Sequence, residues 1–310
     1  MSSRTRILCH LTAFLCAALW GSTFVSTKIL IGAGLTPAQI FTIRFLMAYI
    51  PMLLVCHRRL WARTWRDEGL LFLLGLTGGS LYFLTENMAL AYSTATNVSL
   101  LVCSCPLVTT LLWRLSVRGA RLSRQKVGGA VLAFAGMVLV VLNGQFVLHL
   151  SPLGDGLAIV ACLCWAVYSI LLEPLSRHYS AAFITRKTFF YGLITILPYY
   201  LLHPGLPEAA VLLRTEVIGN LLFLGLIASL ACFWVWNAVI ERLGAVATTN
   251  YVYINPISTI IIASIVLGET ITPYFLTGSA MIITGMYLSN ARNGKRKNEG
   301  KNQVTVSREE

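Results

Sequence analysis

Long apolar runs separated by short polar segments dominate the chain from residue 7 to residue 291. A helix needs about 20 mostly apolar residues to cross a bilayer, and each run approaches that length. None of the runs alternates apolar and polar positions as the strands of a membrane barrel do, so the pattern predicts helices. The ten expected helices lie near residues 7–32, 37–56, 69–92, 95–114, 125–143, 154–175, 181–203, 215–238, 245–267 and 273–291.

The composition agrees with a chain that lies in lipid. Of the 310 residues, 56% are hydrophobic and only 12% are charged, which leaves too little polar surface to cover a soluble domain of this size. Arg4 and Arg6 precede the first run as the basic start of a signal peptide does, but the run is too long for one and is expected to be retained. The expected fold class is an all-α integral membrane protein with ten transmembrane helices.

The basic residues predict the orientation, because cytoplasmic loops retain lysine and arginine. With the N-terminus inside, only Lys28, Arg44 and Arg214 of the 24 lysines and arginines fall in the membrane or on the outer side. We therefore expect a multi-pass protein of the plasma (inner) membrane with both termini in the cytoplasm. Residues 292–310 are polar and basic and are expected to form a disordered cytoplasmic tail. The net charge of +12 is spread over these separate segments, which argues against a nucleic-acid partner.

A repeat relates the two halves of the chain. The matched pairs are Phe83 and Phe233, Asn87 and Asn237, Ala95 and Ala245, Pro106 and Pro256, and Thr109 and Thr259 at a shift of 150 residues, Trp20 and Trp165 at 145, and Phe45 and Phe189 at 144. We divide the chain into a first repeat at residues 1–143 and a second at residues 154–291. Each repeat holds five helices, an odd number, so the second enters the membrane from the opposite side. Such inverted repeats suit a carrier that works by alternating access.

Three ionisable residues lie inside the predicted helices, where a charge is costly unless it has a function or a partner. They are Lys28, Arg44 and Glu86, all expected in the outer third of the bilayer. One interpretation is a charged site that binds a polar substrate group, with Glu86 carrying a coupling proton. The other is a static pair of Glu86 with Arg44 or Lys28, and Lys28 is also long enough to reach the interface.

Aromatic and amide side chains also lie deeper in the predicted helices than an interfacial belt requires. As a set they favour a cavity, in which rings supply apolar contact and amides orient a polar group, although for any single one a packing or lipid-facing role is the better explanation. With the two charges above, the candidate substrate-binding residues are Trp20, Arg44, Tyr82, Glu86, Asn87, Trp165, Trp236, Asn237, Tyr251 and Asn255.

Two further patterns concern the helices themselves. Pro106 and Pro256 occupy matched positions and are expected to break their helices, as at moving or site-lining segments. Small residues recur on the last helix of each half and predict close packing, either within the chain or in a homodimer. These are Gly128, Gly129, Gly136, Thr277, Gly278 and Gly285.

No catalytic constellation is found. The eight cysteines lie in or beside apolar runs without C-x-x-C spacing, and the sequence contains no phosphate-binding loop and no metal-ligand spacing. Neither an enzyme nor an ATP-driven pump is indicated, and no cofactor is expected.

The chain resembles the drug/metabolite transporter superfamily, EamA type, over residues 7 to 291. The resemblance rests on an ordered set of segments: Trp20-Gly21-Ser22-Thr23-Phe24, Arg44-Phe45, Glu86-Asn87-Met88-Ala89-Leu90-Ala91-Tyr92, the stretches Ala95 to Pro106 and Ala245 to Pro256, and Leu267-Gly268-Glu269. It implies a ten-helix carrier with a central cavity, often an exporter of amino acids or other metabolites, without a metal or organic cofactor. The chain departs from the family where Arg118-Gly119-Ala120-Arg121 replaces a second Gly-Glu.

Two functions from different classes follow. The first is secondary transport of a small polar metabolite, with the lipid bilayer and, in the homodimer alternative, a second copy of the chain as the other expected partners. The second is a non-transporting membrane receptor or scaffold. The same helices could form it if the cavity does not open to the two sides of the membrane in turn.

Overall fold

The structure is a computed structural model that describes residues 3–93, 95–116, 123–142, 151–267 and 272–290. Every regular element in these ranges is a helix. The predicted tail and the segments Arg118-Gly119-Ala120-Arg121 and Gly268-Glu269 lie outside the described residues.

The first half runs through five helical stretches. They are α1 (Ser3–Gly32), α2 (Pro37–Val55), α3 (Trp65–Gly75) continued by the π-helical η1 (Leu76–Ser80) and α4 (Leu81–Tyr92), α5 (Ala95–Val102) followed by α6 (Cys105–Ser116), and α7 (Arg124–Leu142). Local sequence sets several starts. Thr36 caps α2 with a reciprocal bond from Gln39, and Pro37 follows at the first helical position, where its missing N–H costs nothing.

The second half repeats the order of elements. It comprises α8 (Pro152–Leu175), α9 (Ala181–Thr195) with α10 (Leu197–Leu202), the short α11 (Ala209–Leu212), α12 (Thr215–Leu222) continued by the π-helical η2 (Phe223–Ala231) and α13 (Cys232–Leu243), α14 (Ala245–Thr249) with the 3-10 helix η3 (Asn250–Ile254) and α15 (Asn255–Leu267), and α16 (Pro273–Asn290). Each of the ten expected runs is thus helical within the described residues.

Seven of the helical stretches are long and apolar enough to cross a membrane. They are Arg4–Gly32, Pro37–Val55, Trp65–Tyr92, Val98–Ser116, Arg124–Leu142, Pro152–Leu175 and Thr215–Leu243. Two of the other three expected runs are interrupted. The run 181–203 is interrupted at Ile196, just before Pro198, and the run 245–267 is split into three short elements.

The two matched prolines lie at equivalent breaks. Pro106 is in the first turn of α6, after a turn at Cys103 and Ser104, and Pro256 is in the first turn of α15, after η3. The π-helical segments also correspond, since a shift of 150 residues carries η1 into the range of η2. Both halves are therefore irregular at the same two places, and π-helical segments are often found at functional sites.

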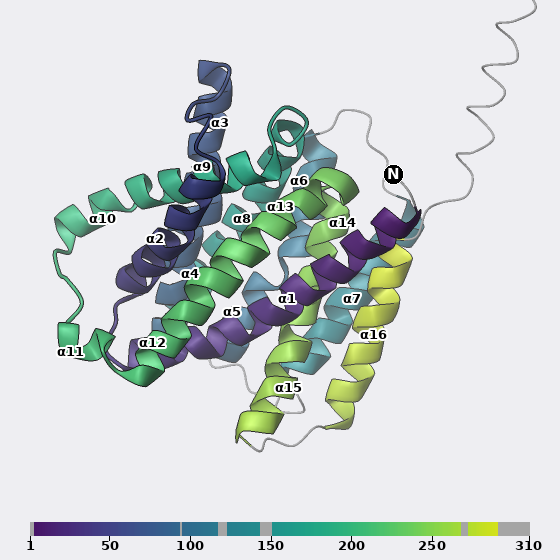
Figure 1. The fold of residues 1–310 in the computed structure, drawn as a ribbon. Coiled ribbons are helices and arrows are strands. Elements are labelled where there is room, and N and C mark those ends of the chain that lie inside the picture. Colours follow the sequence, from purple (N-terminus) through teal and green to yellow (C-terminus); the bar gives the residue numbers. More distant parts are fainter. Residues whose placement is uncertain (1–2, 94, 117–122, 143–150, 268–271, 291–310) are drawn as a thin grey trace, which may run out of the picture.

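Small residues join α7 to α16, and Figure 1 shows these two helices side by side. A Cβ at Gly136 would lie 2.6 Å from the carbonyl oxygen of Gly278, and one at Gly285 would lie 2.5 Å from that of Gly129. The two backbones are thus in direct contact. The small residues predicted close packing either within the chain or in a homodimer. The structure contains the packing between the two halves of one chain.

Aromatic rings fill the centre of the molecule. Phe233 on α13 is 1% exposed, and its ring centroid lies 5.6 Å from that of Trp165, 5.9 Å from that of Trp20 and 6.0 Å from that of Phe83. Phe233 and Phe83 are a matched pair of the repeat, so corresponding positions of the two halves meet in the core.

Candidate functional site

A cavity lies between elements of both halves. Six of the ten predicted site residues line it: Trp20, Arg44, Tyr82, Glu86, Trp165 and Asn255. The rest of the wall is mainly apolar, with Phe24, Phe83 and Phe233 among its members. Apolar walls with a few polar groups are typical of small-molecule sites.

Glu86 is held in the wall by its own helix. It lies one turn after Tyr82 on α4, so the two side chains share a face, and the Tyr82 hydroxyl donates to Glu86 Oε1 at 2.7 Å. The Tyr82 ring packs against Trp165 with 5.1 Å between centroids. The carboxylate is therefore buried, and Tyr82 is its side-chain donor within the described residues, which leaves acceptor capacity toward the cavity.

Arg44 is oriented by α2 and by the second half. Its guanidinium lies 4.3 Å from the centre of the Phe83 ring, and its Nε donates to Ser229 Oγ at 2.8 Å. Ser229 belongs to the π-helical η2, at the position that matches Gly79 of η1. Because Nε is occupied, the outer nitrogens of the guanidinium fork remain for a ligand.

Arg44 and Glu86 do not form the static pair that the sequence left open. Within the described residues, the ion pair closer than 4.0 Å is that of Lys187 with Glu68. Arg44 and Glu86 thus present opposite charges to one cavity without neutralising each other directly. A buried charge without a direct counterion is costly, so such an arrangement suits a site that is completed by a ligand.

Trp20 links the cavity to η2. Its indole Nε1 donates to the carbonyl oxygen of Ala228 at 2.9 Å, and its ring meets that of Trp165 edge-on at 5.3 Å. A π-helical turn shifts the backbone bonding by one residue, which is how a carbonyl becomes free to accept from a side chain.

The position after Trp20, Gly21, has no room for a side chain. A Cβ there would lie 1.9 Å from Ser258 Oγ and 2.4 Å from the carbonyl oxygen of Asn255. The Gly21 carbonyl in turn accepts from Thr259 Oγ1 at 2.6 Å. The close approach of α1 to α15 brings Asn255 to the cavity wall, and its side-chain amide, once turned so that the nitrogen faces an acceptor, donates to the Ala17 carbonyl at 2.9 Å.

Four predicted residues do not line the cavity. Asn87 donates to the Pro37 carbonyl at 3.2 Å, Trp236 packs behind Trp20, Asn237 bonds to Tyr168 and Thr185, and Tyr251 bonds to His10 at 2.7 Å. Their positions are those of packing residues, and their predicted contact with substrate stays a prediction. Lys28 is exposed and is likewise outside the cavity wall.

Sequence reasoning missed two sets of residues. Ser229, which holds Arg44, carries no charge, and only its match to Gly79 in the repeat could have marked it. Arg186 and Lys187 enter the sequence analysis only as basic residues of the cytoplasmic side, and Glu68 does not enter it, yet all three are buried. The position of Lys187 inside the apolar run 181–203 was an available signal.

Known proteins resemble this chain in sequence and in fold. A protein of Archaeoglobus fulgidus described as an uncharacterized transporter is 32% identical over 94% of this chain and 99% of its own length. A Salmonella typhimurium protein described as a probable amino-acid metabolite efflux pump is 25% identical over 89% of this chain and 93% of its own length. A solved crystal structure superimposes with a TM-score of 0.72 at 17% identity and covers 91% of this chain and 96% of its own, which supports the fold.

Long apolar helices and these likenesses define a multi-pass membrane protein of the transporter class. The EamA-like transporter family matches residues 7–142 and again residues 152–291, so the chain belongs to that family. The resemblance drawn from the sequence is confirmed.

Proposed function

We propose that this chain is a secondary active transporter that exports amino acids or related small polar metabolites by alternating access. The main observation is that Arg44 and Glu86 face one aromatic cavity without an ion pair between them. A carboxylate is the natural ligand of a guanidinium fork, and an ammonium group is the natural ligand of a carboxylate. A zwitterion presents both groups at once and neutralises both buried charges.

The aromatic rings support the same class of substrate. Trp20, Tyr82 and Trp165 stand beside Glu86 on the wall of the cavity, and their faces attract a cation. Phe24 and Phe233 supply apolar contact for a side chain. The Salmonella relative is described as a probable efflux pump for amino-acid metabolites, which supports this substrate class for the present chain.

The proposed membrane arrangement has ten crossings, as two inverted five-helix repeats, with both termini in the cytoplasm of a cell bounded by the plasma (inner) membrane. The helical character of all ten runs, the double match to the family and the placement of the basic residues support it. With an odd number of crossings per repeat, the halves exchange conformations, and the cavity between them faces each side in turn.

A proteoliposome assay tests the proposal. The purified chain is reconstituted, and counterflow of labelled amino acids, amino-acid derivatives, nucleosides and sugars is measured with and without a proton gradient. We expect counterflow of at least one amino acid or derivative and none in protein-free vesicles. Vesicles in which no amino-acid compound moves, although the protein is folded and inserted, contradict the proposal.

We further propose that Glu86 carries the coupling proton. Among the described residues it is the acidic one on the cavity wall, and Tyr82 is bonded to it as a neighbouring hydroxyl. At saturating substrate, Glu86→Gln is expected to keep exchange of substrate across the membrane but to abolish accumulation driven by a pH gradient. Unchanged gradient-driven accumulation in Glu86→Gln removes this role.

A further inference from the structure

A second buried network joins the two halves at one end of the molecule. Glu68, in the first turn of α3, accepts through Oε1 from the Lys187 ammonium and from the Tyr191 hydroxyl, both on α9. Its other oxygen accepts from the backbone N–H of Ala62 at 2.6 Å. The residues Glu68 and Lys187 are only 8% and 2% exposed, so this is a buried ion pair between the halves.

The neighbouring contacts fasten a whole loop of the first half to the second. The guanidinium of Arg186 donates to the carbonyl oxygens of Cys56 at 3.0 Å, Arg59 at 2.7 Å and Leu60 at 3.0 Å. A guanidinium group is planar and its five N–H donors have fixed directions, so it holds these carbonyl groups rigidly. The connection between α2 and α3 is therefore held by α9.

Tyr179, just before α9, makes a third link. Its hydroxyl accepts from the backbone N–H of Arg63 at 2.8 Å and donates to Asp67 Oδ2 at 2.7 Å. Burial raises the pKa of the Tyr179 hydroxyl above its usual value, so the proton that it donates is retained at neutral pH. We call Glu68, Tyr179, Arg186, Lys187 and Tyr191 the inter-half lock.

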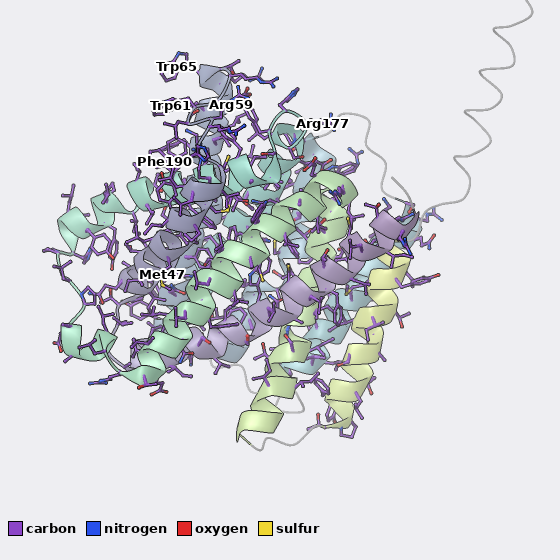
Figure 2. The ribbon with its side chains drawn as sticks, in the orientation of Figure 1. Met47, Arg59, Trp61, Trp65, Arg177 and Phe190 are labelled. Atoms are coloured by element: carbon purple, nitrogen blue, oxygen red, sulfur yellow. The ribbon has the colours of Figure 1, made fainter. Side chains whose placement is uncertain are left out.

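The inter-half lock lies away from the cavity. Glu68 precedes Glu86 by 18 residues along α3, η1 and α4, which is roughly 27 Å at the rise of a helix. Figure 2 shows Trp61, Trp65 and Arg177 at the same end of the molecule, and the Lys187 ammonium lies 4.4 Å from the centre of the Trp61 ring. Arg59 and Arg177, two of the basic residues that predict the cytoplasmic side, belong to this end.

The repeat shows that the opposite end has no equivalent ion pair. The shift that pairs Phe45 with Phe189 places Ile43 at the position of Lys187, and the shift that pairs Phe83 with Phe233 places Ile218 at the position of Glu68. In the fold, α2 packs on α12 and η2 as α9 packs on α3 and η1. The matched positions thus differ in chemistry: one pair is the ion pair of Glu68 with Lys187, and the other is two isoleucines.

We propose that the inter-half lock is the cytoplasmic gate of the transporter and that its asymmetry biases the resting protein toward the conformation closed on this side. The proposal rests on the proposed function, because alternating access requires the two halves to part at each end in turn. Glu68 and Lys187 are then positioning residues of the transport cycle that do not touch the substrate. Opening the gate requires the separation of α3 from α9.

Distance measurement by double electron–electron resonance tests the gate. Spin labels are attached at Trp65→Cys on α3 and Arg177→Cys before α9, both exposed positions, in a chain whose eight native cysteines are replaced. With Glu68 intact we expect one dominant short distance. Glu68→Gln removes charge-assisted bonds and is expected to raise the ratio of the long-distance to the short-distance population about 10- to 100-fold.

A matched control and a milder variant complete the test. Glu216, in the first turn of α12, is an exposed acid close to the position that matches Glu68, and Glu216→Gln is expected to leave the distances unchanged. Tyr191→Phe keeps the ring and removes one bond to Glu68, so it is expected to shift the populations in the same direction by a smaller factor. If Glu68→Gln does not fold, the distance distribution measured in Tyr191→Phe decides whether the inter-half lock is the gate.

Distance distributions that are the same in the unsubstituted chain, Glu68→Gln and Tyr191→Phe overturn the gate. A shift as large in Glu216→Gln as in Glu68→Gln also overturns it, because any loss of acidic charge would then suffice. The measurement needs no substrate. A chain that shows the shift but transports no amino-acid compound contradicts the proposed function alone, and a working transporter without the shift contradicts the gate alone.

Discussion

At the scale of single residues, the cavity depends on how two opposite charges are kept apart. Ser229 and the Phe83 ring hold the Arg44 guanidinium, and the Tyr82 hydroxyl holds the Glu86 carboxylate. Each charge thus has a neutral neighbour that fixes its direction without cancelling it. This arrangement pre-organises the site for a ligand that carries both complementary charges.

Substitution of either charge should weaken substrate binding. Arg44→Gln and Glu86→Gln each remove a charge-assisted bond worth about 1.5–3 kcal/mol, so the apparent dissociation constant is expected to rise by roughly 10- to 150-fold. Binding of a labelled amino-acid substrate to the purified variants measures the change. Lys28→Gln serves as the control, because Lys28 is exposed and outside the cavity wall. Equal losses in all three variants would show that the cavity is not the binding site.

The sequence predicted the charges of this cavity better than its polar supports. Arg44 and Glu86 stood out because ionisable residues are rare in apolar helices. Asn237 and Trp236 were equally conspicuous but pack behind the cavity, since sequence spacing alone does not tell which face of a helix looks inward. Ser229 could not be recognised, because a serine in an apolar helix is common and its bond to Arg44 depends on the π-helical η2.

At the scale of elements, the irregular segments set the geometry. Helix breaks before Pro106 and Pro256 were predictable, because proline cannot donate the backbone bond of a regular helix. The π-helical segments η1 and η2 were not predictable, because one extra residue in a turn does not change the apolar pattern of a run. They matter nonetheless, since η2 provides both the Ala228 carbonyl for Trp20 and the Ser229 hydroxyl for Arg44.

The seam between α7 and α16 can be tested by adding a single methyl group. A Cβ at Gly129 would lie 2.5 Å from the Ser289 backbone nitrogen and 2.6 Å from the Gly285 carbonyl oxygen, so Gly129→Ala forces the helices apart. Overpacking of this kind costs about 1–3 kcal/mol, and a lower thermal unfolding midpoint is expected.

The adjacent Gly128 provides the control for that measurement. A Cβ at Gly128 meets no atom within 4 Å, so Gly128→Ala has the same gain in helix propensity without the clash. Its unfolding midpoint is expected to equal or exceed that of the unsubstituted chain. Equal destabilisation by both substitutions would contradict a tight glycine seam.

At the scale of the whole molecule, the two halves share an order of elements but differ in chemistry. The repeat itself was predictable from the sequence, because matched residues recur over five consecutive apolar runs. The inter-half lock was not, because Glu68 precedes its apolar run and Arg186 and Lys187 counted only toward topology. Tertiary packing decides that these three charges are buried, and no local pattern contains that information.

The run at residues 181–203 offers a direct test of the proposed topology. It is outside the seven stretches that pass as membrane spans by length and composition, yet ten crossings require it to cross. Cysteines at Arg177 and Leu206, exposed positions on either side of the run, should therefore lie on opposite sides of the membrane.

An impermeant maleimide added to intact cells reads out the two positions. Leu206→Cys is expected to react from outside, and Arg177→Cys only after the membrane is permeabilised. Reaction of both cysteines from the same side would exclude ten crossings in the proposed order.

The central claim, that one zwitterion bridges Arg44 and Glu86 during transport, is tested most directly by counterflow with trimmed substrates. For an amino acid that the reconstituted chain transports, exchange is compared with that of its amide, which lacks the carboxylate, and its deaminated acid, which lacks the ammonium group. The account predicts exchange of the intact amino acid only, with discrimination against the amide lost in Arg44→Gln and against the deaminated acid lost in Glu86→Gln. Equal exchange of all three compounds by the unsubstituted chain, or unchanged discrimination in both variants, would contradict it.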